Sequence, residues 1–442
     1  MSKHAINYKE VLIGKIKNHT AKIGVVGLGY VGLPFAVEKA KVGFTVVGIE
    51  QNPDRAAQIN AGKNYMPDVK DEELSNLVSE GLIKADTTFD RVPELDVLVI
   101  CVPTPLDQHL APDLQHVEAV TDKLAEHLRP GQLISLESTT YPGTTEEVIM
   151  PILEKSGLQA DQDFYLCHSP ERVDPGNKRY TTKNTNKVVG GIGPRSQEVA
   201  VAFYSQTIEH LVTVSSPRAA ELVKVFENTF RSVNIALVNE IALLCDKMDL
   251  NVWEVLDAAF TKPFGIMPFY PGPGVGGHCI PIDPHYLEWK AREFNFTTRF
   301  IGLAGEVNRR MPEFVYEKAL RILNELGKAP SCSKILLLGI AYKKDLGDCR
   351  DSPAIDLAEL LRRDHAELDY NDPFVDDVEI NGTIVESQTL TEQLLASADL
   401  VIITTDHSSY DYNWIVKNSN KILDTRNATA TVTGDREKIV LL

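Results

Sequence analysis

The fold is set by the stretch Lys22-Ile23-Gly24-Val25-Val26-Gly27-Leu28-Gly29-Tyr30-Val31-Gly32. Its first five residues form the apolar run of a buried parallel strand, and the spacing of Phe35, Val37 and Ala40 predicts a helix after the turn. The glycines occupy the three fixed positions of a G-x-G-x-x-G turn. The first allows a tight turn, the second lets a pyrophosphate approach the backbone, and the third lets helix and strand pack closely. The stretch therefore predicts a Rossmann-like domain that binds a dinucleotide.

The second strand indicates which dinucleotide is bound. Thr45 to Ile49 is predicted as a strand, and Glu50, which follows it, lies 18 residues after Gly32. A carboxylate at this place binds both hydroxyls of a ribose and repels a 2′-phosphate. The pattern favours NAD over NADP. A βα turn that serves packing alone is the alternative.

Further strand and loop pairs follow in this domain. Asp96 to Val102 and Gln132 to Leu136 are predicted strands, and each continues into a polar loop that contains proline. Ligands of an open parallel sheet sit beyond the carboxyl ends of the strands, so these loops are expected to line the nicotinamide half of the site. A short strand from Phe164 to Cys167 brings Glu171 to the same edge. A solvated loop acid is the alternative for Glu171.

A mainly helical region comes next. Ser216-Pro217 is an N-cap followed by proline at the first helical position, and the predicted helix runs from Arg218 to about Met248. Lys224 and Asn228, four residues apart, project from one side of it, either toward one ligand atom or as an ordinary exposed pair. Its apolar face is expected at Leu222, Val225, Phe226, Thr229, Phe230 and Val233. Helices are also predicted at 252–260, 284–294 and 299–327, and this region offers a surface for dimerisation.

A loop in this region carries the candidate nucleophile, Cys279. It reads Gly274-Val275-Gly276-Gly277-His278-Cys279-Ile280-Pro281-Ile282-Asp283-Pro284. The prolines forbid a regular helix through the cysteine, and Asp283-Pro284 predicts the start of a helix just after it. A thiol ahead of a helix N-terminus is favoured as thiolate. The alternatives are a buried cysteine in a tight turn and a metal site, but the spacing of His278, Cys279, Asp283 and His285 matches no common metal-ligand pattern.

A second α/β domain begins at Lys334. Its predicted strands are Lys334 to Gly339, Leu368 to Tyr370, Leu400 to Thr404, and Ile422 to Leu423. Basic side chains follow these strands, namely Lys343, Lys344, Arg350 and Arg426. At the carboxyl edge of the sheet they would bind an anion such as a nucleotide diphosphate. A solvated charged rim is the alternative.

Composition limits the classes of function. A chain of 442 residues predicts two or three domains, and a net charge of −17 argues against nucleic acid or an anionic membrane as partner. Nothing reaches the apolar length of a membrane span, and the polar N-terminus lacks the apolar stretch of a signal peptide, so none is expected. The six cysteines are scattered, as in reduced cytosolic proteins, so we expect a cytoplasmic protein. The expected divisions are an N-terminal extension with a short amphipathic helix (1–20), the NAD-binding domain (21–215), a helical connector (216–328) and a C-terminal domain (329–442).

Together these residues resemble the UDP-glucose/GDP-mannose dehydrogenase family, from about Lys22 to the C-terminus. The motifs Ser169 to Gly176 and Phe269 to Gly274 resemble the branch that oxidises UDP-N-acetylhexosamines. The resemblance implies two Rossmann-like doubly wound domains joined by a mainly helical region, and oxidation of the sugar C6 alcohol to a carboxylate by two NAD through an enzyme-bound thioester. The expected substrate is UDP-N-acetylglucosamine, with UDP-N-acetylmannosamine as the competing choice. A homodimer through the central helix is implied, with larger assemblies left open, and a role in making a surface polysaccharide or glycan.

The resemblance also assigns roles to residues of this chain. Cys279 is the nucleophile, and Lys224 and Asn228 stabilise the oxyanions at C6. Asp283 is the base that assists the cysteine or the water. Glu171 is the general acid/base of the hydrolytic step, helped by Thr139 through a bound water. The implied cofactor contacts are Gly27, Gly29, Tyr30, Val31, Gly32, Glu50, Arg55, Thr104 and Thr139. The implied substrate contacts are Glu171, Arg172, Val173, Lys224, Asn228, Tyr270, Gly272, Gly276, Lys343 and Arg426.

The sequence departs from the UDP-glucose enzymes of the family in two places. Where they carry an arginine that reaches a neighbouring subunit's substrate, this chain reads Thr261 to Gly265, and Lys262 is the nearest candidate to replace it. After Glu171 they have an apolar pair and a second acid, whereas this chain has Arg172, Val173 and Asp174. Arg172 is expected to meet an N-acetyl oxygen or a phosphate.

Two other classes of protein share part of this pattern. A non-catalytic NAD-binding regulator would bind NAD without turnover and would have no use for a nucleophile. A plain alcohol dehydrogenase of the 6-phosphogluconate type shares the glycine turn and the central helices. It needs neither Cys279 nor a second α/β domain.

Overall fold

The computed structural model describes residues 7–66, 69–107, 109–173 and 179–442. It divides into two compact units. The first consists of Met1–Glu227 with Trp289–Phe296, and the second of Asn228–Glu288 with Thr297–Leu442. The predicted domain limits of 20/21, 215/216 and 328/329 stay predictions. Among the described residues, no helix has the length and apolar character needed to cross a bilayer.

The first unit is built on an eight-stranded sheet in the order β3-β2-β1-β4-β5-β6-β7-β8. Its strands are parallel as far as β6, whereas β7 is antiparallel to β6 and β8 runs with β7. The carboxyl ends of β1, β4, β5 and β6 therefore share one edge. The strands are β1 Lys22–Val26, β2 Thr45–Ile49, β3 Ile83–Asp86, β4 Val97–Ile100, β5 Leu133–Leu136, β6 Tyr165–His168, β7 Lys187–Gly191 and β8 Leu211–Thr213.

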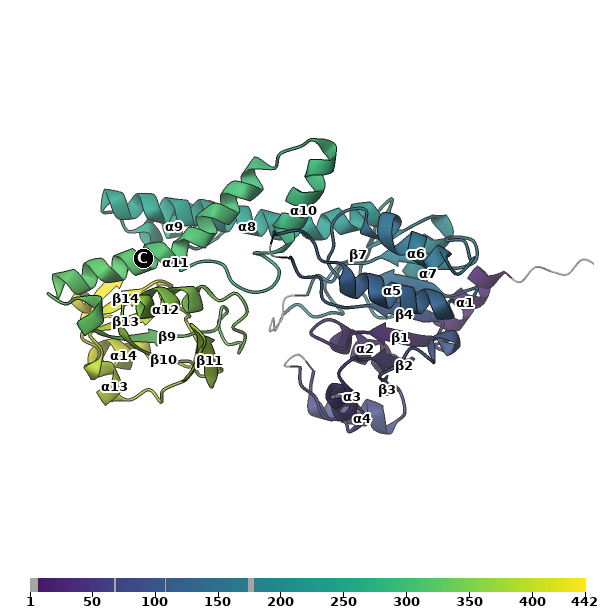
Figure 1. Cartoon of the computed structure of the whole chain (residues 1–442), viewed down its shortest axis with the longest axis horizontal. Helices are drawn as coiled ribbons and strands as arrows, with labels where there is room; N and C mark the ends of the chain where they lie inside the picture. Colours follow the sequence, from purple (N-terminus) through teal and green to yellow (C-terminus); the bar gives the residue numbers. More distant parts are fainter. Residues whose placement is uncertain (1–6, 67–68, 108, 174–178) are drawn as a thin grey trace, which may run out of the picture. The chain divides into compact units, whose positions relative to one another are not determined.

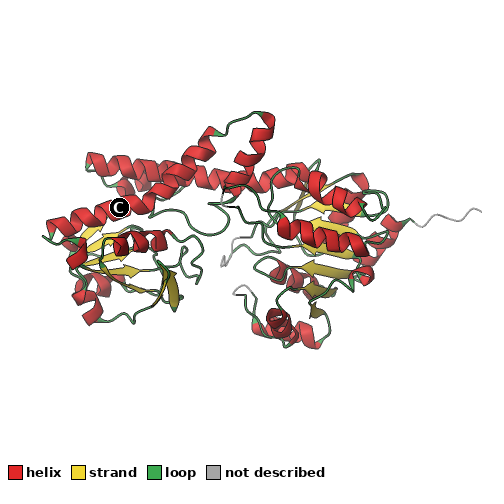
Figure 2. Ribbon diagram, viewed as in Figure 1, coloured by secondary structure: helices red, strands yellow, loops and turns green. Residues whose placement is uncertain are grey.

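Helices cover both faces of this sheet, as the red ribbons around the yellow strands show (Figure 2). Side chains alternate along each strand, so Val25 enters one core with α2 and α7, and Val26 enters the other with α5. The two faces are thus both buried, as in a doubly wound fold. The helices are α1 Tyr8–Lys17, α2 Gly32–Lys41, α3 Pro53–Asn60, α4 Asp71–Ser79, α5 Gln115–His127, α6 Met150–Glu154 and α7 Pro194–Tyr204.

The N-terminal extension forms the predicted short helix, α1. It buries Leu12 and Ile16, and it lies against α7. Lys15 Nζ lies 2.8 Å from Asp96 Oδ1, next to the start of β4. The helix therefore adds to the core of the first unit. Residues 1–6 of the predicted extension lie outside the described residues.

The central helices follow the predicted pattern with small shifts. They are α8 Pro217–Met248, α9 Val252–Phe260, α10 Asp283–Ala291 and α11 Arg299–Glu325. Helix α10 includes Asp283, one residue earlier than predicted, and its last turn continues as the short 3₁₀ helix Arg292–Phe294. The apolar face predicted for α8 is only partly covered, because Val225 is buried while Phe226 and Phe230 are exposed.

The second unit carries a parallel sheet in the order β10-β9-β13-β14-β15, the yellow-green part of Figure 1. Leu337 packs toward α11 and α12, and Leu338 packs on the other face, toward α13 and α14. The predicted fold class, two doubly wound sheets with a helical central region, is confirmed. The elements are β9 Lys334–Leu338, α12 Pro353–Arg363, β10 Glu367–Asn371, β11 Asp377–Ile380, β12 Thr383–Glu386, α13 Glu392–Ser397, β13 Leu400–Ile403, α14 Tyr412–Asn418, β14 Ile422–Asp424 and β15 Ile439–Leu441.

Candidate active site

The glycine turn between β1 and α2 has the shape that a pyrophosphate requires. Gly27 has a φ of +87°, and a Cβ at Gly32 would lie 1.9 Å from the carbonyl oxygen of Gly27. A Cβ at Gly29 would meet no atom within 4 Å. The backbone at Gly29 therefore faces open space ahead of the N-terminus of α2, where an anion is stabilised.

Glu50 stands at the end of β2 next to this turn. The residue is buried, and its carboxylate accepts hydrogen bonds from the backbone N–H of Leu28 at 3.1 Å and of Asn52 at 3.0 Å. Each oxygen keeps a second lone pair for a ribose hydroxyl. Arg55 stacks over the ring of Tyr65, whose hydroxyl donates to the carbonyl of Leu28. The residues present at the turn therefore fit NAD.

The loops after β4 and β5 are tied to each other and to α8. Thr104 Oγ1 donates to the carbonyl of Thr139 at 2.7 Å, so the structure brings these two predicted cofactor residues together. The buried Glu221 of α8 accepts hydrogen bonds from the backbone N–H of Gly143 and of Thr145. The start of α8 thus holds the loop that carries Thr139.

Glu171 has donors on both carboxylate oxygens. Oε1 accepts from the backbone N–H of Arg172 and of Val173, at 2.7 and 2.8 Å, and Oε2 lies 3.3 Å from Lys187 Nζ. Burial alone would raise the pKa of Glu171, but Lys187, the two N–H groups and Lys224 outweigh it and hold the pKa below its usual value. Glu171 is thus an ionised, oriented carboxylate and not a solvated loop acid.

The second unit holds the cysteine loop. Cys279 is exposed, and its carbonyl accepts from the backbone N–H of Ile282 and of Asp283, which forms the turn into α10. The alternative of a buried cysteine is therefore wrong. Asp283 is buried, and Asn228 Nδ2 donates to its Oδ2 at 2.5 Å. The loop presents a thiol to solvent immediately ahead of a buried carboxylate and amide.

The loop around Gly272 and Gly276 packs on the second sheet's loops. A Cβ at Gly272 would lie 2.5 Å from Arg426 Nη1, so the backbone of Gly272 packs directly against this half-buried guanidinium. The Gly272 N–H donates to Asn239 Oδ1 at 3.1 Å, and Gly276 packs against Tyr342. The two glycines predicted to contact substrate thus lie beside the loops that follow β9 and β14.

Two residues of the predicted basic cluster form ion pairs with acidic side chains. Lys344 Nζ lies 3.3 Å from Asp406, and Arg350 makes a two-pronged ion pair with Asp348. Lys343 lies half-buried in the loop after β9, and Arg426 Nε donates to the carbonyl of Thr404. Arg426 and Lys343 are the residues of this cluster that the resemblance assigns to substrate.

Family comparisons agree with these two nucleotide-binding edges. The chain matches the models of the UDP-glucose/GDP-mannose dehydrogenase family for its NAD binding domain (residues 21–208), its central domain (218–310) and its UDP binding domain (336–431). The chain belongs to the UDP-glucose/GDP-mannose dehydrogenase family. It is therefore an NAD-dependent dehydrogenase of a UDP-sugar, and NAD is its cofactor.

Individual relatives of this family are similar over most of their length. A UDP-N-acetyl-D-mannosamine dehydrogenase of Pyrococcus horikoshii is 35% identical over 89% of this chain and 91% of its own. A UDP-N-acetyl-D-glucosamine 6-dehydrogenase of Pseudomonas aeruginosa is 36% identical over 80% of this chain and 83% of its own. A solved structure of UDP-D-ManNAc dehydrogenase from Pyrococcus horikoshii superimposes with a TM-score of 0.86 at 34% identity, covering 95% of this chain and 98% of that one.

The structure gives Arg172 a protein partner that the sequence did not reveal. Its guanidinium pairs with both carboxylate oxygens of Glu227 on α8, at 2.5 and 3.2 Å, and also donates to the carbonyl of Asn186. In this structure it braces the loop after β6 against α8. A contact of Arg172 with the sugar stays a prediction, and Asp174 lies outside the described residues.

Tyr270 and His285, two further residues singled out from the sequence, also have protein partners. The exposed Tyr270 donates to Asp257 and stacks on Trp253 of α9. His285 Nδ1 lies 3.1 Å from Glu288, and its Nε2 lies 3.5 Å from Arg309. Within the described ranges there is no group of three or more side chains placed to ligate a metal ion.

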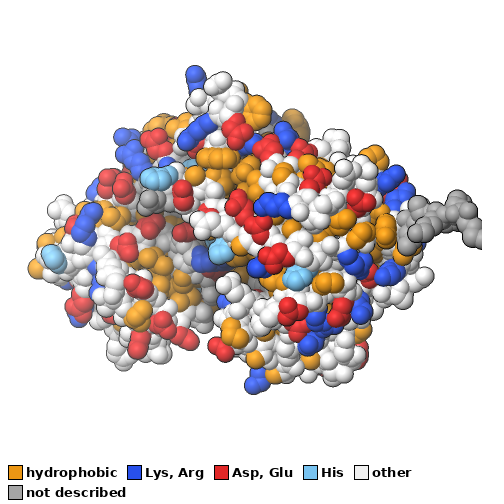
Figure 3. Space-filling model, turned by 45° about the vertical axis from the view of Figure 1, so that its right-hand side comes forward, with side chains coloured by type: hydrophobic (Ala, Val, Ile, Leu, Met, Phe, Trp, Pro, Cys, Tyr) orange, Lys and Arg blue, Asp and Glu red, His pale blue; other side chains and the backbone are white. Residues whose placement is uncertain are grey.

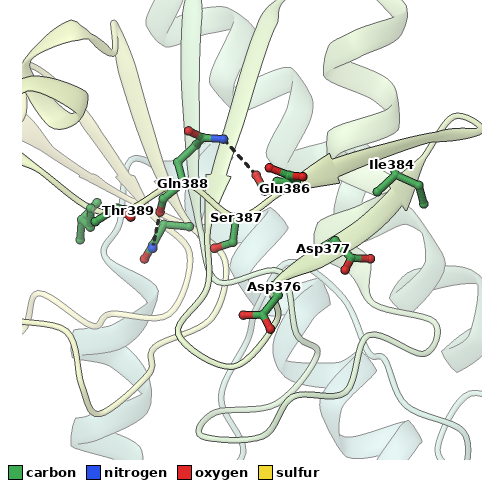
Figure 4. Close-up of a pocket in the computed structure, with 9 residues that line it drawn as sticks. Asp376, Asp377, Ile384, Glu386, Ser387, Gln388 and Thr389 are labelled. Carbon is green, nitrogen blue, oxygen red and sulfur yellow. Dashed lines mark hydrogen bonds between the residues drawn. The ribbon is translucent and has the colours of Figure 1, made fainter.

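A separate groove of about 660 Å³ lies at the β11–β12 hairpin of the second unit. Figure 4 shows Asp376, Asp377 and Glu386 around it, with Gln388 donating to the carbonyl of Glu386. None of the predicted substrate residues lines it. Carboxylates repel the diphosphate of a UDP-sugar, so this groove is not the nucleotide site.

Sequence reasoning missed the buried residues that surround Glu171. Lys187 of β7 lies 3.0 Å from Glu137, and Glu137 accepts from the hydroxyl of Tyr204 at 2.7 Å. Burial raises the pKa of Glu137, although Lys187 opposes this. The signal available was the apolar run Val188–Val189 after a lysine, which is too short to predict a strand on its own.

Proposed function

We propose that this enzyme oxidises the C6 hydroxyl of UDP-N-acetylglucosamine to the carboxylate, using two NAD per sugar and a thioester on Cys279. The observation that carries the proposal is the exposed Cys279 in the turn ahead of buried Asp283, which is itself bonded to Asn228. A dehydrogenase that stopped at the aldehyde would have no use for a thiol at this place.

Side chains of the enzyme bond to C6 of the sugar, stabilise the charge on its oxygen and transfer protons in successive steps. NAD, when bound, supplies the hydride acceptor for both oxidations. In the first oxidation a hydride leaves C6 while a base takes the hydroxyl proton. Cys279 Sγ then bonds to C6 of the aldehyde and gives a thiohemiacetal, which loses a second hydride and its hydroxyl proton to leave a thioester. Lys224 and Asn228 stabilise the negative charge on the C6 oxygen, and Asp283 takes the proton of the thiol or of the water.

Hydrolysis of the thioester releases the acid and regenerates the thiol. Water adds to C6, the C6–Sγ bond breaks, and Cys279 leaves as thiolate. Glu171 orients that water and accepts a proton from it as general base. Thr139 assists Glu171 through a bound water. Glu171 is ionised, and both of its carboxylate oxygens accept hydrogen bonds. This supports the role, because an oriented carboxylate can accept a proton from water.

The UDP part binds at the loops of the second sheet. Lys343 and Arg426 neutralise the diphosphate, and Gly272 and Gly276 let the backbone approach the nucleotide. Tyr270 contacts the substrate from the same loop, while Arg172 and Val173 contact the sugar. Support comes from the packing of Gly272 on Arg426 and from the match of residues 336–431, which include Lys343 and Arg426, to the family's UDP binding domain.

UDP-N-acetylmannosamine is the second candidate substrate. Relatives named for either substrate are about equally similar to this chain, at 35% and 36% identity. The two sugars differ in the direction of one amide. The product, an acidic amino sugar, suits a surface polysaccharide or glycan.

A homodimer through the central helix belongs to the proposal. Exposed apolar side chains recur along α8 at spacings of four and seven residues, which is one helical face. They are 42% to 60% exposed. Figure 3 shows hydrophobic side chains, in orange, on one face of the molecule. A second copy of the same helix would cover this stripe. The stripe consists of Leu222, Phe226, Phe230, Leu237, Leu244 and Met248.

The domain limits at 20/21, 215/216 and 328/329 and a cytoplasmic location are also part of the proposal. The location rests on the scattered cysteines of the chain.

The test is a comparison of turnover on UDP-N-acetylglucosamine, UDP-N-acetylmannosamine, UDP-N-acetylgalactosamine and UDP-glucose, each with NAD. We expect the highest kcat/KM for UDP-N-acetylglucosamine and its loss in Cys279→Ser. Cys332→Ser, at another exposed cysteine, is the matched control and should keep full activity. Preference for UDP-N-acetylmannosamine would establish the second candidate, and an active Cys279→Ser would overturn the thioester.

A further inference from the structure

A buried ammonium group lies between two carboxyl groups beneath the loop that carries Glu171. Lys187 Nζ is 3.0 Å from Glu137 Oε2 and 3.3 Å from Glu171 Oε2, and it also contacts the carbonyl of Pro170 at 3.4 Å. The side chains of Lys187 and Glu137 are almost completely buried, with 4% and 0% exposed. An ammonium in such a place stays charged only because its acceptors are fixed around it.

Sheet topology explains why this lysine is at the active edge. β7 is antiparallel to β6, with His168 opposite Gly190 and Cys167 opposite Gly191. Continuing this register by three residues brings Lys187, the first residue of β7, opposite Glu171. A parallel strand would have placed its first residue at the far edge of the sheet. Because β7 is antiparallel to β6, Lys187 at the start of β7 lies beside the loop that follows β6.

The other end of the network fixes Glu137. Its Oε1 accepts from the hydroxyl of Tyr204, and that hydroxyl lies 2.8 Å from Ser135 Oγ. Glu137 is thus held by α7 and β5, and Lys187 is shared between this fixed acceptor and Glu171. Buried networks of this kind lock side chains in one rotamer when each member is satisfied.

We propose that Lys187, held by Glu137, is a positioning residue that keeps Glu171 ionised and in one orientation for the hydrolytic step. This inference rests on the proposed role of Glu171. Oε1 is fixed by two backbone N–H groups and Oε2 by Lys187, so the carboxylate plane has a single orientation. Lys187 itself does not touch the reacting atoms.

Several titratable groups described around Glu171 have pKa values that burial shifts. Burial lowers the pKa of His168 to about 3, and burial raises the pKa values of Cys101, Cys167 and Tyr204. Lys224 adds positive charge from α8, and Arg172 is paired with Glu227. Among the described residues, the charged and titratable groups around the network include Lys187, Glu137, Lys224, Arg172, Glu227, Lys39, His168, Cys101, Cys167 and Tyr204.

Removing the charge of Lys187 should shift the pH at which Glu171 takes up a proton in a predictable direction. In Lys187→Met, burial still penalises the charged form of Glu171, and Glu137 then faces it without a cation between them. Both effects raise the pH at which Glu171 takes up a proton. In Glu137→Gln the Lys187 ammonium is no longer shared with a second carboxylate. The pH at which Glu171 takes up a proton should therefore fall or stay the same. Lys187→Arg keeps the cation.

The experiment is the pH profile of kcat for the wild-type enzyme and these variants, with Glu171→Gln as the reference that removes the titrating group. We expect the acid limb of Lys187→Met to move up by at least one pH unit. Lys187→Arg should restore the limb to near the wild-type position. An acid limb that stays in place in Lys187→Met, or that moves up in Glu137→Gln, would overturn the inference. Glu137→Gln carries the test if Lys187→Met fails to fold.

Failure of the inference is distinguishable from failure of the proposed role of Glu171. If Glu171→Gln keeps both the wild-type rate and the acid limb, Glu171 is not the acid/base, and the inference falls with it. If Glu171→Gln loses the limb while Lys187→Met keeps it unmoved, the role of Glu171 stands and Lys187 is only a structural residue.

Discussion

Replacing Lys39 by methionine tests whether a buried amine is kept uncharged inside the first unit. Lys39 of α2 is 0% exposed, its Nζ donates to the carbonyl of Phe203 at 2.9 Å, and it lies 3.8 Å from the centre of the Phe203 ring. Burial is the main cause that lowers the pKa of Lys39 well below 10.5, with Glu137 acting against it and Lys187 in the same direction.

The sign of the pH dependence follows from this lowered pKa. Between the folded-state pKa and 10.5, the unfolded chain binds a proton at Lys39 that the folded chain does not. Folding stability therefore rises with pH through this window by up to about 1.4 kcal/mol per pH unit. From pH 8.0 to 9.5 the wild-type protein should gain up to roughly 2 kcal/mol relative to Lys39→Met, or about 4–8 °C in Tm.

The assay is thermal unfolding of wild type and variant at matched pH values between 8.0 and 9.5. Other groups titrate equally in both proteins, so the difference in Tm isolates Lys39. Lys123→Met, at an exposed lysine of α5, is the control and should show a Tm difference that does not vary with pH. If the Lys39→Met difference is likewise independent of pH, Lys39 is charged in the folded protein and the reasoning is refuted.

Three further changes test the nucleotide sites and the proposed dimer. Gly32→Ala places a Cβ 1.9 Å from the Gly27 carbonyl, so the turn must open and the Kd for NAD should rise at least about tenfold by calorimetric titration. An unchanged Kd would contradict the turn's role. Arg426→Met should weaken UDP binding by roughly ten- to a hundredfold while leaving NAD binding intact, because charged hydrogen bonds are worth about 1.5–3 kcal/mol. Equal weakening of both ligands would indicate general damage instead. Leu237→Glu should convert the dimer to monomers in light scattering, whereas Arg231→Glu, also exposed on α8, should not.

Local patterns were sufficient to predict the elements that form the nucleotide edges. β1, the glycine turn and α2 follow from an apolar run, three glycines and a helical period within one segment. Cys279 was predicted on a loop because prolines and glycines determine local backbone conformation, and the structure leaves it exposed.

Features that depend on distant partners were missed. Lys187 precedes a two-residue apolar run, and only its antiparallel pairing with β6 makes it a buried residue beside Glu171. The ion pair of Arg172 with Glu227, which is distant in sequence, was likewise not predicted. The apolar face of α8 was predicted correctly as a pattern, yet a pattern does not say what covers Phe226. The periodicity of a sequence indicates which side of an element is apolar. Tertiary contacts decide which residues that side and the charged side chains contact.

The most direct test of the proposed reaction is the number of NADH molecules formed per UDP-N-acetylglucosamine consumed. We predict two NADH per sugar, with the uronic acid as product, and loss of that acid in Cys279→Ser. One NADH per sugar, an aldehyde product and an unaffected Cys279→Ser would contradict the four-electron route through the cysteine.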